Sequence, residues 1–261
     1  MSQRYIIPSL DRAIEVLGLL ARSKEGLTLA DIARATDIPK STLFRILTTL
    51  QHHQCVQWRE DERCFRVGHY LWQLGSGFLD QCEPYRASEQ HMKRLSEATG
   101  ETALLARLQD DLVLYLRRVD GTNTVALMRN LGESTPIFCT ASGRAILAFL
   151  PPNESDALLA RQSLQRYTDK TVTDLASLQK SLAQVRRQGY CIIDGEYNEE
   201  VLFISAPVLD HSARPCAAVT LAMLSSRRAQ PGFVQRCALL VRESADAFSQ
   251  DMGYHGQRVA A

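Results

Sequence analysis

The first 68 residues contain three short stretches with the apolar spacing of helices, followed by two strand-like runs. This order restricts the fold more than any other feature of the chain. Ser9 is expected to cap the first helix. Apolar residues then recur on one helix face at Leu10, Ala13, Ile14, Leu17 and Leu20. Thr28 is expected to cap a short second helix, with Asp31 at the third position as a partial capping box.

The third helix, predicted over residues 38–51, carries its polar and cationic residues at its start and an apolar stripe behind them. The stripe consists of Leu43, Ile46, Leu47 and Leu50. Residues 55–60 and 63–68 are predicted to form a hairpin around a charged tip. Three helices followed by a hairpin predict a winged helix-turn-helix, whose last helix enters the DNA major groove with its N-terminal residues toward the base edges.

Charge gives this prediction less support than pattern does, because residues 1–80 hold ten Lys and Arg against nine Asp and Glu. Affinity for DNA phosphates would therefore depend on local placement. The residues predicted to bind DNA are Arg12, Thr28, Lys40, Ser41, Thr42, Arg45, Arg59 and Arg63. The alternative is that the same residues form a solvated helix face in an interaction module.

The remaining chain is long enough for a second domain, since the protein has 261 residues and the hydrophobic content, 45%, of a soluble globular protein. Seven cysteines lack the spacing of zinc ligands, so neither a metal nor a cofactor is expected. No run of eighteen apolar residues and no signal-peptide core is visible, which predicts a cytoplasmic protein without a membrane anchor. A net charge of +1 identifies no partner.

Residues 69–83 are predicted to form a connecting helix interrupted by Gly75 and Gly77, and residues 84–261 a second domain. The large apolar residues of the connecting helix are expected to pack either against a second copy of the chain or back on their own chain. From residue 84 onward helices and strands alternate. Helices are predicted at 84–100, after Thr140, at 153–162, 177–189 and 231–251, and strands at 101–108, 111–119, 123–130, 189–194, 201–210 and 215–224. This order predicts an α+β fold, with helices packed on a central sheet.

Several segments, taken together and in this order, resemble the IclR-type bacterial transcriptional regulators from about Ser9 to Gly253. In the first domain they are SLDRAIEVLGLL, GLTLADIARATDIPKSTLFRILTTL and FRVG. In the second they are PIFCTASGRAILA, RRQGYCIIDGE and ISAPVLD. The resemblance implies a winged helix-turn-helix over residues 1–68, a linker helix, and a GAF-like effector-binding and oligomerisation domain. It also implies homodimers or dimers of dimers on pseudo-palindromic operator DNA, a small-molecule effector, and an effect on operator occupancy or on RNA polymerase recruitment.

The segment TASGR predicts an anion-accepting helix start. Thr140 can cap the helix, which leaves the backbone amides of Ala141, Ser142 and Gly143 for a ligand, and the helix dipole favours a carboxylate there. The alternative is an ordinary capped helix in which Gly143 serves packing.

The resemblance assigns the rest of the effector pocket to three strands, with the residues Ile193, Asp194, Glu196, Phe203, Ser205, Thr220 and Ala222. Because Ile193 and Phe203 are apolar, such a pocket favours a ligand with one anionic end and an apolar or aromatic body. Asp194 and Glu196 remain open to the alternative that they are surface carboxylates on a turn. Glu200 stands where the family commonly has glycine, so the entry to its strand is expected to differ.

An enzyme is disfavoured, because the chain lacks GxSxG, Walker A, GxGxxG after a strand and HExxH. Cys139 is a remote candidate nucleophile without a patterned histidine partner. A second alternative is a DNA-binding protein whose C-terminal domain only oligomerises. No catalytic residue is therefore predicted.

Overall fold

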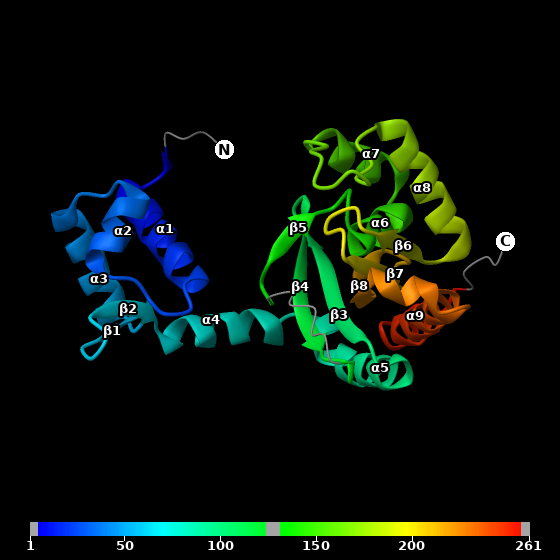
Figure 1. The fold of residues 1–261 in the computed structure, drawn as a ribbon, viewed down its shortest axis with the longest axis horizontal. Coiled ribbons are helices and arrows are strands. Elements are labelled where there is room, and N and C mark those ends of the chain that lie inside the picture. The colour runs from blue at the N-terminus through cyan, green and yellow to red at the C-terminus, as the bar shows by residue number, and fades with distance from the viewer. Residues whose placement is uncertain (1–4, 124–130, 257–261) are drawn as a thin grey trace. The chain divides into compact units, whose positions relative to one another are not determined.

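The computed structural model describes residues 5–123 and 131–256. The chain divides into two compact units, Met1–Gln81 and Cys82–Ala261, and each is described below by itself. Figure 1 shows the elements of both. Residues 124–130, most of the strand predicted at 123–130, lie outside the described residues.

The N-terminal unit contains the three predicted helices and the predicted hairpin. These are α1 (Pro8–Arg22), α2 (Leu29–Thr36), α3 (Lys40–His52), β1 (Val56–Arg59) and β2 (Cys64–Val67), followed by α4 (His69–Asp80). The two strands are antiparallel, with Val56 opposite Val67. The core is apolar and draws on every element from α1 to β2. Its buried residues are Val16, Leu20, Ile32, Ile38, Leu43, Leu47, Val56 and Phe65.

Local chemistry explains where these helices begin. Thr28 caps α2 in a complete capping box with Asp31, which confirms the prediction for that helix. Ser9 does not cap α1. That helix begins at Pro8, two residues before the predicted start, because proline suits the first helical turn, where its missing N–H costs no hydrogen bond. The predicted interruption at Gly75 and Gly77 is also wrong, since α4 continues through both glycines.

The C-terminal unit is built on a six-stranded antiparallel sheet with the strand order β5-β4-β3-β8-β7-β6. The strands are β3 (Thr102–Gln109), β4 (Leu112–Val119), β5 (Ser134–Pro136), β6 (Cys191–Asp194), β7 (Val201–Leu209) and β8 (Pro215–Leu224). Its helices are α5 (Glu83–Thr99), α6 (Ala141–Phe149), α7 (Pro152–Ala160), α8 (Leu175–Gln188), the 3₁₀ helix η2 (Ser225–Ala229) and α9 (Phe233–Asp251). The short edge strand β5 was not predicted from the sequence.

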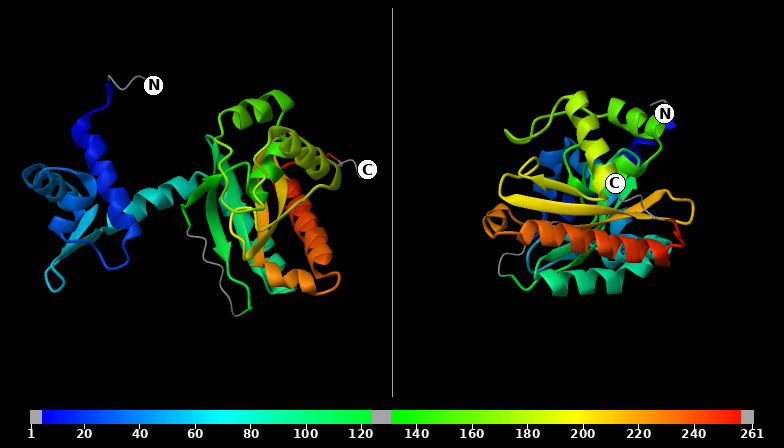
Figure 2. Two further views of the ribbon diagram at one scale, coloured as in Figure 1. Left: turned by 45° about the horizontal axis from the view of Figure 1, so that its top comes forward. Right: turned by 90° about the vertical axis from the view of Figure 1, so that its right-hand side faces the viewer.

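Helices cover both faces of this sheet. Figure 2 shows α5 and α9 running side by side along one face, while α6, α7 and α8 lie on the other. Every residue of β7 is buried, because this strand lies inside the sheet and is covered on both sides. The core under α6 includes Leu104, Tyr115, Ile146 and Phe203. The two-faced burial explains why β7 is an almost continuous apolar run in the sequence.

All seven cysteines are free thiols. None of the helices within the described residues is long and apolar enough to span a bilayer.

Candidate functional site

The outward face of α3 is the candidate DNA-binding surface. Leu43, Ile46 and Leu47 are buried against the rest of the unit. Lys40, Ser41 and Arg45 are exposed, and Thr42 is half-buried. The helix starts at Lys40, after an extended Pro39 at the cap position. The first-turn amides therefore have no side-chain cap and lie beside exposed polar and cationic residues, which suits contact with phosphate.

One member of this face was missed by the sequence analysis. The side chain of Phe44 is 61% exposed. At about 100° per residue, Phe44 projects about 60° from Ser41 and about 40° from Thr48, so it lies at the edge of the polar face of α3. The signal was available in the sequence, because Phe44 falls outside the stripe formed by Leu43, Ile46 and Leu47.

The other predicted DNA-binding residues lie on different elements. Arg12 is exposed on α1, and Arg59 and Arg63 are exposed at the hairpin. Arg59 Nε lies 3.8 Å from Asp61 Oδ1, so this cation already has an acidic neighbour at the tip. The hydroxyl of Thr28 donates to Asp31 Oδ2 at 2.6 Å and accepts from the Asp31 amide, so it is engaged in capping α2.

In the C-terminal unit, the start of α6 lies against the sheet. Thr140 is the N-cap: its hydroxyl accepts from the amide of Gly143 at 3.3 Å and donates to the carbonyl of Pro136 at 2.9 Å. The expectation that all three amides are free is therefore corrected for Gly143, whose N–H is taken by the cap. The amides of Ala141 and Ser142 belong to the first turn, which has no helical acceptor for them. A Cβ at Gly143 would collide with the Ile137 carbonyl, which is why a glycine stands there.

Four buried hydroxyl groups meet beneath this helix start, and we call them the hydroxyl cluster: Tyr115, Ser142, Ser205 and Thr220. Ser142 Oγ lies 3.0 Å from Thr220 Oγ1 and 3.5 Å from the Tyr115 hydroxyl. Ser205 Oγ lies 2.8 Å from Thr220 Oγ1 and donates to the Val219 carbonyl at 3.1 Å. Such groups are costly to bury without partners, and here they satisfy one another. Tyr115 was missed by the sequence analysis, because only the strand pairing brings it here.

The apolar residues predicted for the pocket lie in the neighbouring row of the same sheet. Ile193 is opposite Phe203, and Phe203 is opposite Ala222. Ser205 is likewise opposite Thr220. Since alternate residues of a strand share a face, Phe203 and Ser205 lie on the same face. The structure thus brings the predicted residues of β6, β7 and β8, except Asp194, together near the start of α6, and Glu196 reaches α6 through Arg144.

The two predicted carboxylates have partners within the protein. Asp194 accepts from Ser225 Oγ at 2.5 Å and pairs with Arg228 Nη1 at 2.6 Å. Glu196 forms a two-pronged ion pair with Arg144, at 2.8 and 2.5 Å, and also accepts from the Val172 amide. Neither carboxylate is thus a plain surface group.

Arg144 was not predicted. Its side chain is only 4% exposed, and its Nε donates to the Phe138 carbonyl at 2.7 Å. An arginine within an otherwise small and apolar helix start was the available sequence signal for a buried ion pair.

One thiol near this site is chemically quiet. Burial raises the pKa of Cys191, which shares a sheet face with Ser205, to about 12. A thiol that stays protonated is a poor nucleophile. Cys139 is fully buried immediately before α6.

Comparisons with known proteins relate both units of the chain to one protein family. The model for the IclR helix-turn-helix domain matches residues 9–60, and that for the bacterial transcriptional regulator IclR C-terminal domain matches residues 78–250. The chain is 32% identical over 215 residues to the HTH-type transcriptional regulator BhcR of Paracoccus denitrificans, covering 82% of this chain and 77% of the relative.

Two solved structures share the whole architecture. A transcriptional regulator from Rhodococcus has a TM-score of 0.83 and 27% identity, over 95% of this chain and 98% of its own. An IclR homologue from Microbacterium hydrocarbonoxydans, complexed with 4-hydroxybenzoate, has a TM-score of 0.79 and 25% identity, over 94% and 98%. Both family models match in the expected order and together span most of the chain, and the relatives are regulators rather than enzymes. The protein belongs to the IclR family of bacterial transcriptional regulators.

Proposed function

We propose that this regulator responds to a small organic acid with an apolar or aromatic body, bound between the start of α6 and the hydroxyl cluster. The observation that carries the proposal is a set of four polar groups gathered in an otherwise apolar core. Ligand sites commonly combine an apolar lining with a few convergent polar groups. The Microbacterium relative holds 4-hydroxybenzoate, an aromatic acid, and this lends support to the ligand class.

The proposed ligand contacts divide by chemistry. The carboxylate would accept from the amides of Ala141 and Ser142, where the dipole of α6 favours negative charge. The hydroxyl cluster would bind a polar substituent by exchanging its internal hydrogen bonds for ligand bonds. Ile193, Phe203 and Ala222 would contact the apolar body.

Glu196 and Asp194 take a different part in this proposal. A carboxylate ligand gains nothing from two further carboxylates, and both of these are bonded to arginines. Glu196 holds Arg144, which in turn binds the carbonyl of Phe138 just before Thr140. We therefore assign Glu196 a positioning role at the first turn of α6, and Asp194 the same role toward η2.

On the DNA side, α3 would insert its N-terminal half into the major groove of an operator. Lys40, Ser41 and Thr42 would contact phosphate, and Arg45 a base edge. Arg12, Arg59 and Arg63 would add phosphate contacts from α1 and the hairpin. Thr28 would act indirectly, by fixing α2.

A homodimer on a pseudo-palindromic operator completes the proposal. Helix α4 has no buried residue, and Trp72 in it is 75% exposed, with Leu74 and Phe78 also exposed. Apolar side chains gathered on one helix in this way are typical of an interaction surface. We propose that α4 packs against a second copy of the chain, and light scattering on the purified protein would measure the stoichiometry.

The ligand proposal is tested on the purified full-length protein. An operator is first obtained by selection from genomic fragments at moderate ionic strength. Aromatic carboxylates, beginning with 4-hydroxybenzoate, and glyoxylate are then screened for stabilisation of the protein and for a change in operator affinity. Aromatic acids should raise the melting temperature and shift operator affinity, because an effector must bind two conformations unequally.

Matched serine variants locate the ligand. Ser142→Ala should weaken binding of the aromatic acid about three- to tenfold, the effect of one lost hydrogen bond. Ser88→Ala removes an equally buried serine from α5, on the other face of the sheet, and should leave binding unchanged. Stabilisation by glyoxylate alone would refute the ligand class. A protein that selects an operator but responds to no acid would favour a C-terminal domain that only oligomerises.

A further inference from the structure

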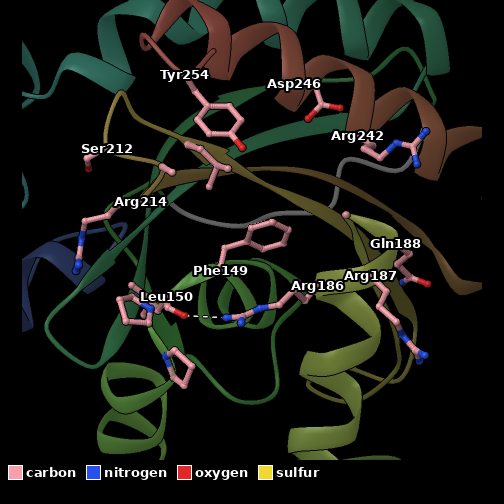
Figure 3. Close-up of a pocket in the computed structure, with 15 residues that line it drawn as sticks. Phe149, Leu150, Arg186, Arg187, Gln188, Ser212, Arg214, Arg242, Asp246 and Tyr254 are labelled. Carbon is pink, nitrogen blue, oxygen red and sulfur yellow. Dashed lines mark hydrogen bonds between the residues drawn. The ribbon is translucent and has the colours of Figure 1, made fainter. Parts of the chain in front are cut away.

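A cavity of about 790 Å³ lies at the far end of α6 from the hydroxyl cluster. Five segments form it: the end of α6, the start of α7, the end of α8, the turn between β7 and β8, and α9 with Tyr254. Figure 3 shows Phe149 in the middle, Arg186, Arg187 and Arg242 toward one side, and Arg214 on the other. The volume is within the range of pockets that hold small molecules.

Four arginines line this cavity against one carboxylate, Asp246, which is itself engaged. Arg214 is neutralised, because it forms a two-pronged ion pair with Glu154 at 3.0 and 2.6 Å. Arg186 donates instead to the carbonyls of Ala148 and Leu150, at 2.5 and 2.9 Å. Carbonyl partners hold its guanidinium in place without cancelling its charge.

Arg187 and Arg242 complete the positive side of the cavity. Among the described residues no ion pair joins either of them to a carboxylate. Arg187 lies in the last turn of α8, where the helix dipole stabilises a positive charge. Arg242 lies in the interior of α9, where the helix dipole gives no such stabilisation. In Figure 3 the two guanidinium groups lie on the same side, above and below Gln188. Within residues 5–123 and 131–256, three positive charges thus remain without a carboxylate partner around this cavity.

The rest of the lining is apolar and includes two aromatic rings. Phe149, Leu150, Pro151 and Leu209 line the cavity together with the ring of Tyr254. A free inorganic anion would use only the arginines. A ligand that uses the whole lining needs two negative charges and an apolar body.

From these features we infer that the cavity is a second small-molecule site, for an organic dianion with an apolar or aromatic body. It is separate from the site under Proposed function. The nine residues of α6 place its two ends about 13 Å apart at 1.5 Å per residue. The inference depends on the arginines and the apolar lining alone, and stands whether or not the hydroxyl cluster binds an effector.

Binding to the full-length protein is measured by calorimetry with three probes: phenyl phosphate, benzene-1,3-dicarboxylate and the neutral benzyl alcohol. The first two are dianions with one ring, and they distinguish a phosphate ligand from a dicarboxylate. At least one dianion should bind, and benzyl alcohol should bind at least tenfold more weakly. Absence of binding by both dianions at 10 mM, or equal binding of benzyl alcohol, would overturn the inference.

Charge reversal locates the bound dianion. Arg242→Glu and Arg187→Glu should each raise its Kd at least tenfold. Arg94→Glu, at an exposed position on α5, makes the same change in net charge elsewhere and should alter Kd less than twofold. Two charge reversals are tested because either variant alone could misfold, and circular dichroism shows whether each variant is folded. A dianion whose binding is insensitive to both reversals but weakened by Ser142→Ala lies at the hydroxyl cluster, and the second site would then be rejected.

Discussion

At the scale of single residues, the C-terminal unit depends on charges and hydroxyls that are buried with their partners. Arg144 and Glu196 join the start of α6 to the segment after β6, and Arg144 also binds the Phe138 carbonyl. Taking both charges out of water is costly, so the pair contributes to stability mainly when it is complete. Losing one partner leaves the other charge buried alone.

Glu196→Gln should therefore lower the free energy of unfolding by about 3 kcal/mol, because Arg144 keeps its charge in a dry environment. Urea denaturation measures the change. Glu154→Gln is the matched control, since it breaks a similar two-pronged pair with Arg214 that is exposed to water and screened by it. The urea midpoint of Glu154→Gln should be nearly the same as that of the wild type. Equal losses in the two variants would contradict the structural importance of the buried pair.

Arg45 is the residue expected to read a base. Arg45→Ala should weaken binding to the selected operator by about 1–3 kcal/mol and reduce its advantage over a scrambled site, because arginine is the usual partner of guanine. Fluorescence anisotropy on both DNAs measures the two affinities. Arg63→Ala, at the hairpin tip, should instead weaken both equally and lower the salt slope by about 1. Unchanged affinity in both variants would mean that the DNA-binding face lies elsewhere.

Phe44 gives a second residue-scale prediction for DNA recognition. An exposed aromatic side chain on the outward face of α3 is suited to contact a thymine methyl group in the major groove. Replacing the operator thymines one at a time with deoxyuridine should weaken wild-type binding about fourfold at one position, from roughly 0.8 kcal/mol per buried methyl. Phe44→Ala should be insensitive to that replacement. If wild type and variant respond alike, Phe44 does not contact the base.

At the scale of elements, the short helix α2 depends on its capping box. Eight residues form few internal hydrogen bonds, so the first turn needs side-chain partners. Thr28 caps the Asp31 amide, and Asp31 accepts in return from Thr28. The hydrogen bonds from Thr28 hold the pKa of Asp31 below its usual value.

Thr28→Ala should destabilise the protein by about 1 kcal/mol, whereas Thr28→Ser should nearly retain stability, since serine caps as well. The depressed pKa of Asp31 fixes the sign of the pH effect. Its contribution is present above the unfolded-state pKa and is lost as the pH falls through the folded-state pKa. The gap between wild type and Thr28→Ala should therefore narrow in acid, as thermal melts across the acidic range would reveal. A gap that is constant or widens in acid would show that Asp31 takes no part.

At the scale of the whole molecule, each of the two units has a hydrophobic core of its own, and the two described cores share no residue. One is centred on Val16, Leu43 and Phe65, the other on Leu104, Leu147 and Phe203. Chains with two such cores commonly depart from two-state unfolding.

Calorimetry on the full-length protein should resolve two transitions, and matched variants should assign them. Leu43→Ala and Leu147→Ala each truncate a buried leucine in a helix and should each cost about 2–5 kcal/mol. The first should lower only one transition and the second only the other, because each variant opens a cavity in a different core. A single transition lowered by both substitutions would show that the two units unfold together.

The sequence alone determined what depends on near neighbours along the chain. Apolar spacing in α3 predicted its buried stripe, and Thr28 with Asp31 predicted the start of α2, because helix geometry relates residues three and four apart. The strands of the large sheet were also largely visible as apolar runs with turns between them. Where two local signals compete, as with Pro8 beside Ser9, the helix start cannot be predicted from one of them, and the prediction of Ser9 as the cap was wrong.

The tertiary structure alone decided which distant residues meet. Ser142 and Thr220 are 78 positions apart, and Arg144 and Glu196 are 52 apart. Their contact follows from the strand order and from the packing of α6 on the sheet, which local periodicity does not encode. Tyr115 joins the hydroxyl cluster for the same reason. The arginines around the cavity at the far end of α6 likewise come from three separate segments. Spacing along the chain fixes the face on which a side chain lies, but only the burial of a shared core determines what lies opposite that face.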